Sequence, residues 1–407
     1  MDYQDVIIIG AGASGLAAAV AAGEHGDKVL VLERSEHIGR KLLASGNGRC
    51  NLMNTAAPVY YGDTDFALSV LSNCNEDCLI GFWRHYGLKL RSDTEGRVYP
   101  ATNKSSSVLD TLTKAVRLND VKILLSAPAL SVKKQDDLFQ VVTDNGKIFH
   151  CRRVIVSAGG AAQPKLGGSY DGYSILQKFG HRLIPVHPAL TRLIAEPKTV
   201  SGLSGIRVKC IVSVKNNGVT VHSEKGELLF TDNGISGICV MQCSRFVIPN
   251  ISICHIDLIY DLFPSDNDAF QELSSLREIY ADEAPQTLIQ GICVPKLAFA
   301  VCKQAGIPIR EYTCRKITDK QITDIIKTLH CYSIKIIGKE GFESAQISAG
   351  GISCEEFSPA TMESLVNPGL YASGEVLNVD GACGGYNLMF AFASGILAGT
   401  AGRGIYD

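Results

Sequence analysis

Glycines and a carboxylate near the start of the chain have the types and spacing that a nucleotide pyrophosphate requires. Gly10, Gly12 and Gly15 follow a short apolar run, and Glu33 ends the next one. The first glycine permits a sharp turn, the second lets the backbone approach a pyrophosphate, and the third allows a helix to pack closely on a strand. Because a carboxylate at the position of Glu33 accepts hydrogen bonds from ribose hydroxyls, these residues predict a dinucleotide site.

The elements that must position these residues are a strand, a helix and a second strand. Residues 6–9 are apolar and β-branched, residues 16–22 are mostly alanine, and residues 28–32 form a second apolar run. Buried parallel strands flanking a helix have this composition. The helix begins beside Ala13 and Ser14, where its free N–H groups and its dipole attract phosphate.

Two other interpretations of this segment are weaker. A strand–helix turn can be tight without binding any ligand, but the acid that ends the second strand favours the nucleotide. The absence of charge over residues 6–23 is compatible with a membrane span. However, glycines and alanines fill its helical half, and no basic segment precedes it. We therefore predict nucleotide binding and no membrane partner.

A second segment with chemistry-bearing residues lies near the other end of the chain. Residues 369–375 end in Gly374 and Glu375, and residues 384–387 read Gly-Gly-Tyr-Asn. A distant return of the chain to the same site indicates FAD rather than NAD. A second full Gly-x-Gly-x-x-Gly pattern is absent from the sequence. NAD(P)H would therefore bind transiently near the flavin rather than on a Rossmann domain of its own.

The composition describes an ordinary globular protein of two or three domains. The chain has 407 residues, of which 46% are hydrophobic and 20% charged. A net charge of −2 and an isoelectric point of about 6.5 predict no general attraction to nucleic acid or to anionic membranes. We expect a small-molecule substrate and no nucleic-acid partner, with the oligomeric state left open.

The 14 cysteines indicate free thiols rather than a metal site. They form no Cys-x-x-Cys pair. The nearest spacings are Cys74 with Cys78 and Cys239 with Cys243, and neither pair has a second pair of His or Cys residues nearby. Because no secretory signal begins the sequence, we expect reduced thiols, a cytoplasmic location and no metal.

The composition and the hydrophobic pattern of the sequence change along the chain in an order that predicts an inserted domain. Glycine-rich residues 35–55 contain several cations, a combination typical of an anion-binding loop. Short alternating runs, including 218–223 and 227–230, predict an antiparallel barrel or sheet, and helices follow, among them 284–291. The expected parts are a nucleotide-binding domain in residues 1–187 and 345–407, a barrel domain in 188–261 and 330–344, and a helical insert in 262–329.

Three longer motifs resemble those of a known family. They are Gly-Arg-Lys-Leu-Leu-Ala-Ser-Gly-Asn-Gly-Arg-Cys-Asn at 39–51, Thr-Asp-Asn-Gly-Ile-Ser-Gly at 231–237, and Gly-Glu-Val-Leu-Asn-Val-Asp-Gly at 374–381 with the Gly-Gly-Tyr-Asn of 384–387. The resemblance spans essentially the whole chain. The sequence is identified as a member of the YhiN/BaiN-like flavoproteins, which include aminoacetone oxidase-type enzymes and belong to the glutathione-reductase-like FAD class.

The resemblance implies an α/β fold with a Rossmann-like FAD-binding domain, an inserted β-barrel domain and a helical domain nested within that insertion. It also implies non-covalent FAD. The family's contacts to the adenosine part and the pyrophosphate fall on Ser14 and Gly15 at the pyrophosphate, Glu33 and Arg34 at the adenosine ribose, and Ala129 at the adenine. Contacts along the pyrophosphate and towards the flavin fall on Arg40, Lys41, Ser45, Gly46, Gly48, Arg49, Cys50 and Asn51, and a further turn contains Ala158, Gly159 and Gly160. Contacts near the ribityl chain and the flavin ring fall on Gly374, Glu375, Asn387 and Leu388.

In such a protein the flavin performs the electron transfer, while side chains position the substrate and move protons. We predict Tyr386, Cys50 and Asp380 as the catalytic residues. Tyr386 would donate a proton during reduction of a conjugated C=C bond, or it would only pack against the flavin ring. A disulfide-reductase function is disfavoured because Cys50 lacks a Cys-x(4)-Cys partner next to the flavin.

The function favoured by the resemblance is an FAD-dependent oxidoreductase that reduces an activated C=C bond of a small or medium organic substrate with NAD(P)H. One alternative is a flavin oxidase of a small amine such as an aminoketone, which passes electrons to oxygen. Another is a non-enzymatic flavin-binding sensor or an RNA-associated protein. Met389 and Phe390 stand where Gln and Trp are common in the family, so the identity of the substrate is not carried over from any relative.

Overall fold

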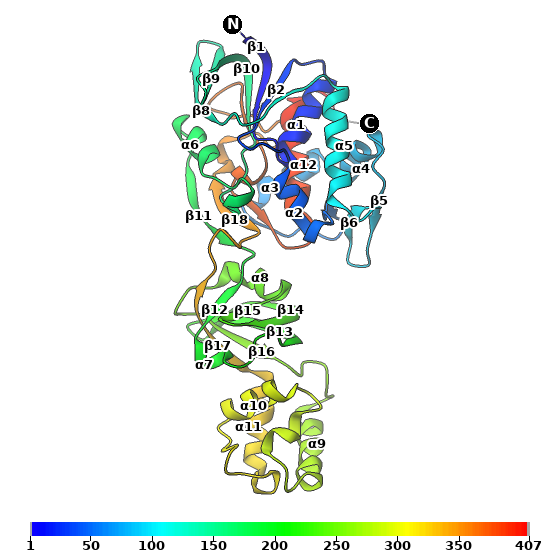
Figure 1. The fold of residues 1–407 in the computed structure, drawn as a ribbon, viewed down its shortest axis with the longest axis vertical. Coiled ribbons are helices and arrows are strands. Elements are labelled where there is room, and N and C mark those ends of the chain that lie inside the picture. Colours follow the sequence, from blue (N-terminus) through cyan, green and yellow to red (C-terminus); the bar gives the residue numbers. More distant parts are fainter. Residues whose placement is uncertain (1, 405–407) are drawn as a thin grey trace. The chain divides into compact units, whose positions relative to one another are not determined.

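The computed structural model describes residues 2–404 and divides into two compact units. Unit 1 comprises Met1–Pro188 and Ala345–Asp407, and unit 2 comprises Ala189–Ser344. The two ends of the chain therefore belong to the same unit, with the middle of the sequence inserted between them. Figure 1 labels many of the elements of both units.

Unit 1 is built on a seven-stranded sheet. Its order is β7 (Lys122–Leu124), β2 (Val29–Leu32), β1 (Asp2–Ile9), β10 (Ile148–Val156), β9 (Leu138–Thr143) and β8 (Ala129–Gln135), with β19 (Leu370–Ala372) also paired to β10. The chain runs from β1 outward to β2 and β7, and then returns to the other side of β1 as β10. In such sheets, ligands bind outside the carboxyl ends of the strands where the order reverses. The end of β1 is therefore the expected binding edge.

Unit 1 also contains α-helices, and two of them touch through small residues. The helices are α1 (Ala13–Glu24), α2 (Arg40–Gly48), α3 (Thr64–Asn73), α4 (Glu76–His85), α5 (Ser105–Leu118), α6 (Asp171–Lys178) and α12 (Tyr386–Thr400). A Cβ atom on Gly395 would lie 2.3 Å from the Ser14 carbonyl oxygen, and one on Gly399 would lie 2.3 Å from the Ala18 carbonyl oxygen. The glycines and alanines of α1 and α12 therefore serve a close helix–helix approach, visible in Figure 1.

The uncharged run at 6–23 is shared between strand β1 and helix α1, which explains its composition without a membrane. Among the described residues, no helix combines the length and the apolar character needed to cross a bilayer.

Small sheets and 3-10 turns complete unit 1. β3 (Met53–Asn54), β6 (Arg97–Pro100) and β5 (Leu90–Ser92) form one sheet, β4 (Tyr60–Gly62) pairs with β20 (Val379–Gly381), and β11 (Leu183–Ala189) pairs with β18 (Ile347–Ile352). The turns are η1 (Pro164–Leu166), η5 (Cys354–Glu356) and η6 (Gly374–Val376). Gly350 and Gly351 lie inside β18, where added Cβ atoms would meet the Pro185 and Leu377 carbonyl oxygens at 2.2 and 2.7 Å. This glycine pair thus serves strand packing.

Unit 2 contains a closed barrel, which confirms the predicted fold class. Its strands are β12 (Leu193–Ala195), β15 (Gly234–Ser236), β14 (Val219–Thr231), β13 (Arg207–Asn216), β16 (Ile253–Asp257) and β17 (Tyr332–Lys339). The prediction of separate strands at 218–223 and 227–230 is wrong, because β14 is continuous and pairs along its length with β13. Gly226 sits within it because a Cβ there would come 3.0 Å from the Cβ of Cys239 on α8 (Ile238–Cys243).

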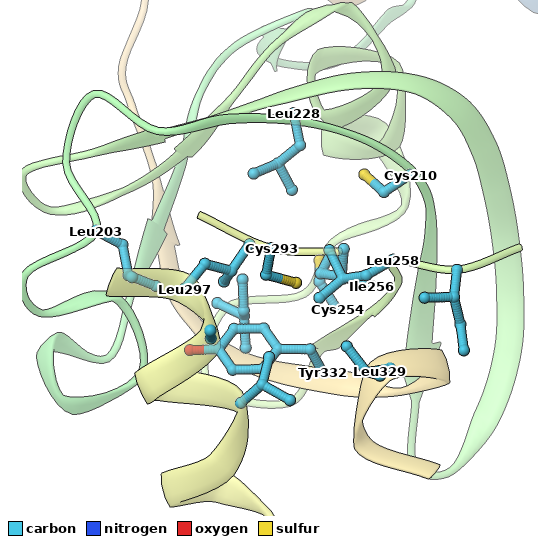
Figure 2. Packing of buried hydrophobic residues seen from close by; sticks show 14 of the residues in the cluster. Leu203, Cys210, Leu228, Cys254, Ile256, Leu258, Cys293, Leu297, Leu329 and Tyr332 are labelled. Atoms are coloured by element: carbon cyan, nitrogen blue, oxygen red, sulfur yellow. The ribbon is translucent and has the colours of Figure 1, made fainter. Parts of the chain in front are cut away.

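The helical part of unit 2 follows β16 and shares its core with the barrel. It contains α9 (Asp266–Ile279), α10 (Pro295–Gln304) and α11 (Asp319–His330), while η3 (Pro285–Ile289) is a 3-10 turn where the helix 284–291 was predicted. Shorter segments are α7 (Pro197–Val200), η2 (Ser244–Phe246) and η4 (Cys314–Lys316). Figure 2 shows barrel residues such as Cys210 and Leu228 in one buried cluster with Leu297 and Leu329 of the helices. Mutual burial of these apolar faces stabilises both parts.

Candidate functional site

The turn between β1 and α1 contains three glycines with different roles. Added Cβ atoms would lie 2.5 Å from the Ser157 carbonyl oxygen at Gly10 and 1.9 Å from the Gly10 carbonyl oxygen at Gly15. Gly10 also has a φ of +105°, so tight packing accounts for both residues. Gly12 differs, because a Cβ there would meet no atom within 4 Å. It faces open space at the N-terminus of α1, where a phosphate can approach.

Glu33 follows β2 and is held against this turn. Its Oε2 accepts a hydrogen bond from the Ala11 backbone N–H at 2.8 Å, and its Oε1 accepts one from the Ser35 N–H at 2.8 Å. Each carboxylate oxygen keeps lone pairs for a further donor. The next residue, Arg34, forms an exposed ion pair with Asp171 at 2.8 Å.

The backbone beside Glu33 comes from a segment that sequence reasoning missed. The Ala127 N–H donates to the Glu33 carbonyl oxygen at 2.9 Å, and the Ser126 N–H donates to the Ser35 carbonyl oxygen at 3.0 Å. Ala129, which we predicted at the adenine, is in register with Thr143 at the start of the β8–β9 pair. We therefore extend the proposed adenine-side segment to residues 126–129. No local signal in the sequence distinguishes these positions.

The cation-rich segment forms a helix and a kink rather than the loop expected over 35–55. α2 begins at Arg40, and its helical dihedral angles are interrupted at Ser45, Gly46 and Asn47. Gly46 and Asn47 are left-handed, with φ of +56° and +55°. Gly48 has a φ of +79° and no atom within 4 Å of an added Cβ. The kink thus exposes backbone beside open space.

The three cations of this segment have partners from distant parts of unit 1. The Arg40 guanidinium donates to the Lys165 carbonyl oxygen at 2.6 Å. The Arg49 guanidinium lies 5.6 Å from the centre of the Tyr99 ring. The Lys41 ammonium lies 2.7 Å from a carboxylate oxygen of Glu375.

Glu375 connects the two ends of the sequence at this site. It lies in η6, and its Oε1 accepts a hydrogen bond from the Ser348 N–H at 2.8 Å. A Cβ on Gly160 would come 2.6 Å from that same Oε1. Gly159, by contrast, has a φ of +74° and open space around an added Cβ. The turn after β10, from Ala158 to Gly160, therefore packs on Glu375 on one side and is open on the other.

Gly374 and Ser14 meet where η6 approaches α1. The Ser14 hydroxyl donates to the Ser373 carbonyl oxygen at 3.5 Å, and the Gly374 N–H donates to the Ser394 hydroxyl at 3.0 Å. A Cβ on Gly374 would lie 2.6 Å from the Ser14 Oγ. These contacts bring the predicted residues of the N-terminal and C-terminal motifs together.

The N-terminus of α12 is the second helix end in the site. Gly385 is its N-cap residue with a φ of +109°. The Asn387 side chain accepts from the Gly381 N–H and donates to the Gly381 carbonyl oxygen, both at 2.8 Å. Asn387 therefore shapes the loop before the helix. The first-turn N–H groups, including that of Leu388, have no intrahelical acceptor and are available to a ligand.

One buried acceptor beside this helix end lacks a partner. Asn51 Oδ1 is inaccessible to solvent and accepts no hydrogen bond from the described residues. A Cβ on Gly385 would lie 2.8 Å from this oxygen. Because a buried acceptor without a donor is costly, its presence indicates a ligand that donates a hydrogen bond here.

The three predicted catalytic residues are all buried in unit 1. Cys50 is fully buried, with a φ of +58°, and burial raises the pKa of its thiol to about 12. Asp380 is 2% exposed and lies in β20, where it is in register with Tyr61 of β4. Tyr386 is the first residue of α12.

Tyr386 is held in place by residues that the sequence did not identify. Its hydroxyl donates to the Ala57 carbonyl oxygen at 3.1 Å, and the Tyr60 hydroxyl donates to the Tyr386 carbonyl oxygen at 2.8 Å. The Tyr60 and Tyr386 rings meet edge to face with centroids 6.0 Å apart. Burial raises the pKa of the Tyr386 phenol, so it is protonated at neutral pH.

The residues of this site fit FAD. Open space lies beside Gly12, Gly48 and Gly159, in the turns expected to face a pyrophosphate. The unpaired Asn51 oxygen lies at the helix end expected to face the flavin. Every cofactor residue predicted from the sequence falls in unit 1. Within the described part of the chain, no cluster of three or more His, Cys, Asp or Glu side chains is arranged to hold a metal ion.

Comparison with known proteins identifies the family to which the chain belongs. A family model described as the HI0933-like protein Rossmann domain matches residues 4–401. A 3-dehydro-bile acid delta(4,6)-reductase of Clostridium scindens is 35% identical over 407 residues, which cover 97% of this chain and 98% of that protein. A ribosomal RNA dihydrouridine synthase of Escherichia coli is 30% identical over 400 residues, covering 97% of this chain and 96% of that protein.

Among solved structures, the open conformation of a flavocytochrome c3 fumarate reductase matches with a TM-score of 0.50 and 17% identity, covering 98% of this chain and 78% of that one. That likeness concerns the fold alone. The family match confirms the resemblance noted from the motifs and the FAD cofactor. The chain belongs to the HI0933-like Rossmann-domain family and is an FAD-dependent oxidoreductase.

Proposed function

We propose that the protein reduces a C=C bond conjugated to a carbonyl group, with NAD(P)H as the electron donor. The names of the curated relatives support this choice through a shared chemistry. One is a reductase of delta(4,6) double bonds in a 3-dehydro-bile acid. Others are synthases of dihydrouridine, which is uridine with its ring C=C bond saturated. An enone and a uracil ring both present a carbonyl conjugated to the bond that is reduced.

The unpaired Asn51 oxygen beside the N-terminus of α12 is the observation that supports placing the reaction there. FAD supplies the hydride chemistry when it is bound. The free N–H groups and the dipole of a fifteen-residue helix favour negative charge at its N-terminus. Asn51 Oδ1 offers an unused hydrogen-bond acceptor at the same place. Together they hold a planar group that carries both an N–H and a developing negative charge.

Of the three predicted catalytic residues, we propose Tyr386 as the proton donor. Addition of hydride to one carbon of an enone leaves the other carbon to take up a proton, and a phenol is a suitable acid. The raised pKa of Tyr386 keeps its hydroxyl protonated. Cys50 has no exposed surface, so we assign it a packing role beside the cofactor. Asp380, in β20, is assigned to positioning the loop that precedes α12.

The test is an anaerobic visible spectrum of the purified protein loaded with FAD. We expect NADH or NADPH to bleach the oxidised-flavin bands, and a conjugated enone to restore them without oxygen. Uridine-containing ribosomal RNA is a second acceptor to be offered in the same experiment. Restoration by neither acceptor after bleaching would reject C=C reduction. Bleaching by a small aminoketone instead, with hydrogen peroxide formed in air, would establish the amine oxidase.

A further inference from the structure

Unit 2 contains an open cleft with positive side chains on its wall. The cleft has a volume of about 460 Å³ and lies between α11, the start of β17 and the segment around α7. Three lysines line it. Lys198 is paired with Glu196 at 3.1 Å, whereas Lys327 and Lys335 form no ion pair with any described residue. Two unpaired ammonium groups on one cleft favour a ligand with negative charge.

The thiol of Cys331 lines this cleft, and an imidazole lies directly beside it. The Cys331 Sγ lies within hydrogen-bond reach of the His255 Nδ1. His255 comes from β16 and is in register with Ser333 of β17. Burial, and then the charge of Lys215, lower the pKa of His255. The imidazole is therefore neutral at neutral pH, and its Nδ1 can accept the thiol proton.

The position of this thiol is fixed by the neighbouring helix. The Gln304 amide at the end of α10 bonds both backbone groups of Ser333, at 2.7 Å to the N–H and 2.9 Å to the carbonyl oxygen. The Ser333 hydroxyl in turn donates to the Cys331 carbonyl oxygen at 3.2 Å. These bonds hold the chain at Cys331 and directly after it.

The other cysteines lack this combination of access, base and positive charge. Of the fourteen, only Cys78, Cys331 and Cys383 are not fully buried. Cys78 Sγ lies 2.7 Å from the Sγ of buried Cys74. Burial raises the pKa of the Cys383 thiol. Cys331 alone stands beside an imidazole and unpaired lysines within the described chain.

We propose that this cleft is a thiol-exchange site for a low-molecular-weight disulfide that carries carboxylates, with Cys331 as the attacking residue. The Cys331 sulfur attacks one sulfur of the disulfide, and His255 takes the thiol proton. A mixed disulfide forms as the original S–S bond breaks, and the departing thiolate takes up a proton to leave as a thiol. The cysteine is oxidised and the small disulfide is reduced, so no other oxidant is required. Lys327 and Lys335 hold the carboxylates.

The test uses the reduced, FAD-loaded protein and two probes, oxidised glutathione and the uncharged hydroxyethyl disulfide. Intact mass and peptide mapping follow the adducts over time. We expect oxidised glutathione to modify Cys331 first, Cys331→Ser to remove this adduct, and Cys78→Ser and Cys383→Ser to retain it. His255→Asn should slow both probes. The double variant Lys327→Gln/Lys335→Gln should slow oxidised glutathione about fivefold and leave the uncharged disulfide unchanged.

Three results would overturn the proposal. They are first modification at Cys78 or Cys383, equal slowing of both probes in the lysine variant, and an unchanged rate in His255→Asn. The flavin spectrum and the circular dichroism of each variant check that it is folded. Because the readout is an adduct on unit 2, failure here leaves the proposed C=C reduction untouched.

Discussion

The ammonium of Lys41 lies 2.7 Å from the carboxylate of Glu375, although the two residues stand near opposite ends of the sequence. The pair joins α2 to η6, and each side chain keeps some exposure, 28% for Lys41 and 21% for Glu375. An ion pair with this exposure contributes about 1 kcal/mol or less to stability. Its significance is therefore positional, because it places a cation beside the turns that we propose face the pyrophosphate.

This placement makes Lys41→Gln a test of the cofactor site. Loss of a charge-assisted hydrogen bond to phosphate should weaken FAD binding about tenfold or more, with little change in stability. The measurement is FAD titration of the flavin-free protein by fluorescence quenching. Lys134→Gln is the matched control, since Lys134 is a half-buried cation of the same unit. Its ammonium donates to the Pro368 carbonyl oxygen at 2.6 Å and lies 5.3 Å from the centre of the Phe139 ring. Equal affinity of both variants would place Lys41 outside the cofactor site.

Substitutions at two glycines of the turn between β1 and α1 should have different effects, one on stability and one on ligand binding. In Gly15→Ala the new Cβ would lie 1.9 Å from the Gly10 carbonyl oxygen, so we expect a loss of about 3 kcal/mol or more in the free energy of unfolding. In Gly12→Ala the new Cβ meets no atom within 4 Å, so the fold should persist. FAD binding should nevertheless be lost, because the methyl group occupies the approach to the pyrophosphate.

Thermal unfolding and flavin content measure these two effects separately. Gly291→Ala serves as the control, because a Cβ there also meets nothing within 4 Å and the residue lies in unit 2. Full flavin content in Gly12→Ala would show that the space beside this glycine is not the cofactor path.

The proton-donor role of Tyr386 is tested by Tyr386→Phe against Tyr60→Phe. Each variant removes one hydroxyl that donates to a backbone carbonyl, of Ala57 and of Tyr386 respectively, so each should cost about 1 kcal/mol of stability. Only Tyr386→Phe should slow re-oxidation of the bleached flavin by an enone, by about a hundredfold. Bleaching by NAD(P)H should be unchanged in both. Equal re-oxidation rates of the two variants in stopped flow would show that Tyr386 only packs in the site and donates no proton.

His181 should make the stability of unit 1 depend on pH. Its side chain is fully buried, bonded to Glu356 at 2.8 Å and to the Ser364 hydroxyl at 3.1 Å, and stacked on Phe357. Burial lowers its pKa below the ordinary 6.5, against the opposing charge of Glu356. As the pH falls through the unfolded value towards the folded one, the unfolded chain binds a proton that the folded protein does not. Stability is therefore present above about pH 6.5 and is lost below it.

The measurement is urea unfolding followed by the fluorescence of Trp83, the single tryptophan, which is buried in unit 1. Between about pH 7.5 and 5.5, the wild-type protein should lose more stability than His181→Asn. Parallel pH curves for the two proteins would show that another group sets the dependence.

Much of the fold follows from local patterns in the sequence. The β1–α1–β2 unit, helix α5 and the capping box of Thr318 and Gln321 that begins α11 depend on residues close together in the chain. Apolar spacing, turn glycines and helix caps depend on residues only a few positions apart, so these elements can be predicted without the structure. The kink of α2 and the continuous β14 were missed because neighbouring elements impose them against local propensity.

The sequence by itself predicted a nucleotide at the N-terminal turn and the return of a C-terminal motif to that turn, because both signals reside in short motifs. Only the tertiary structure decided which side chains meet there. The β4–β20 register brings Tyr60 to Tyr386, and the packing of α12 leaves the Asn51 oxygen unpaired beside Gly385. The His255–Cys331 contact likewise requires the β16–β17 pairing. Such pairings join residues far apart in sequence, and no local pattern encodes their register.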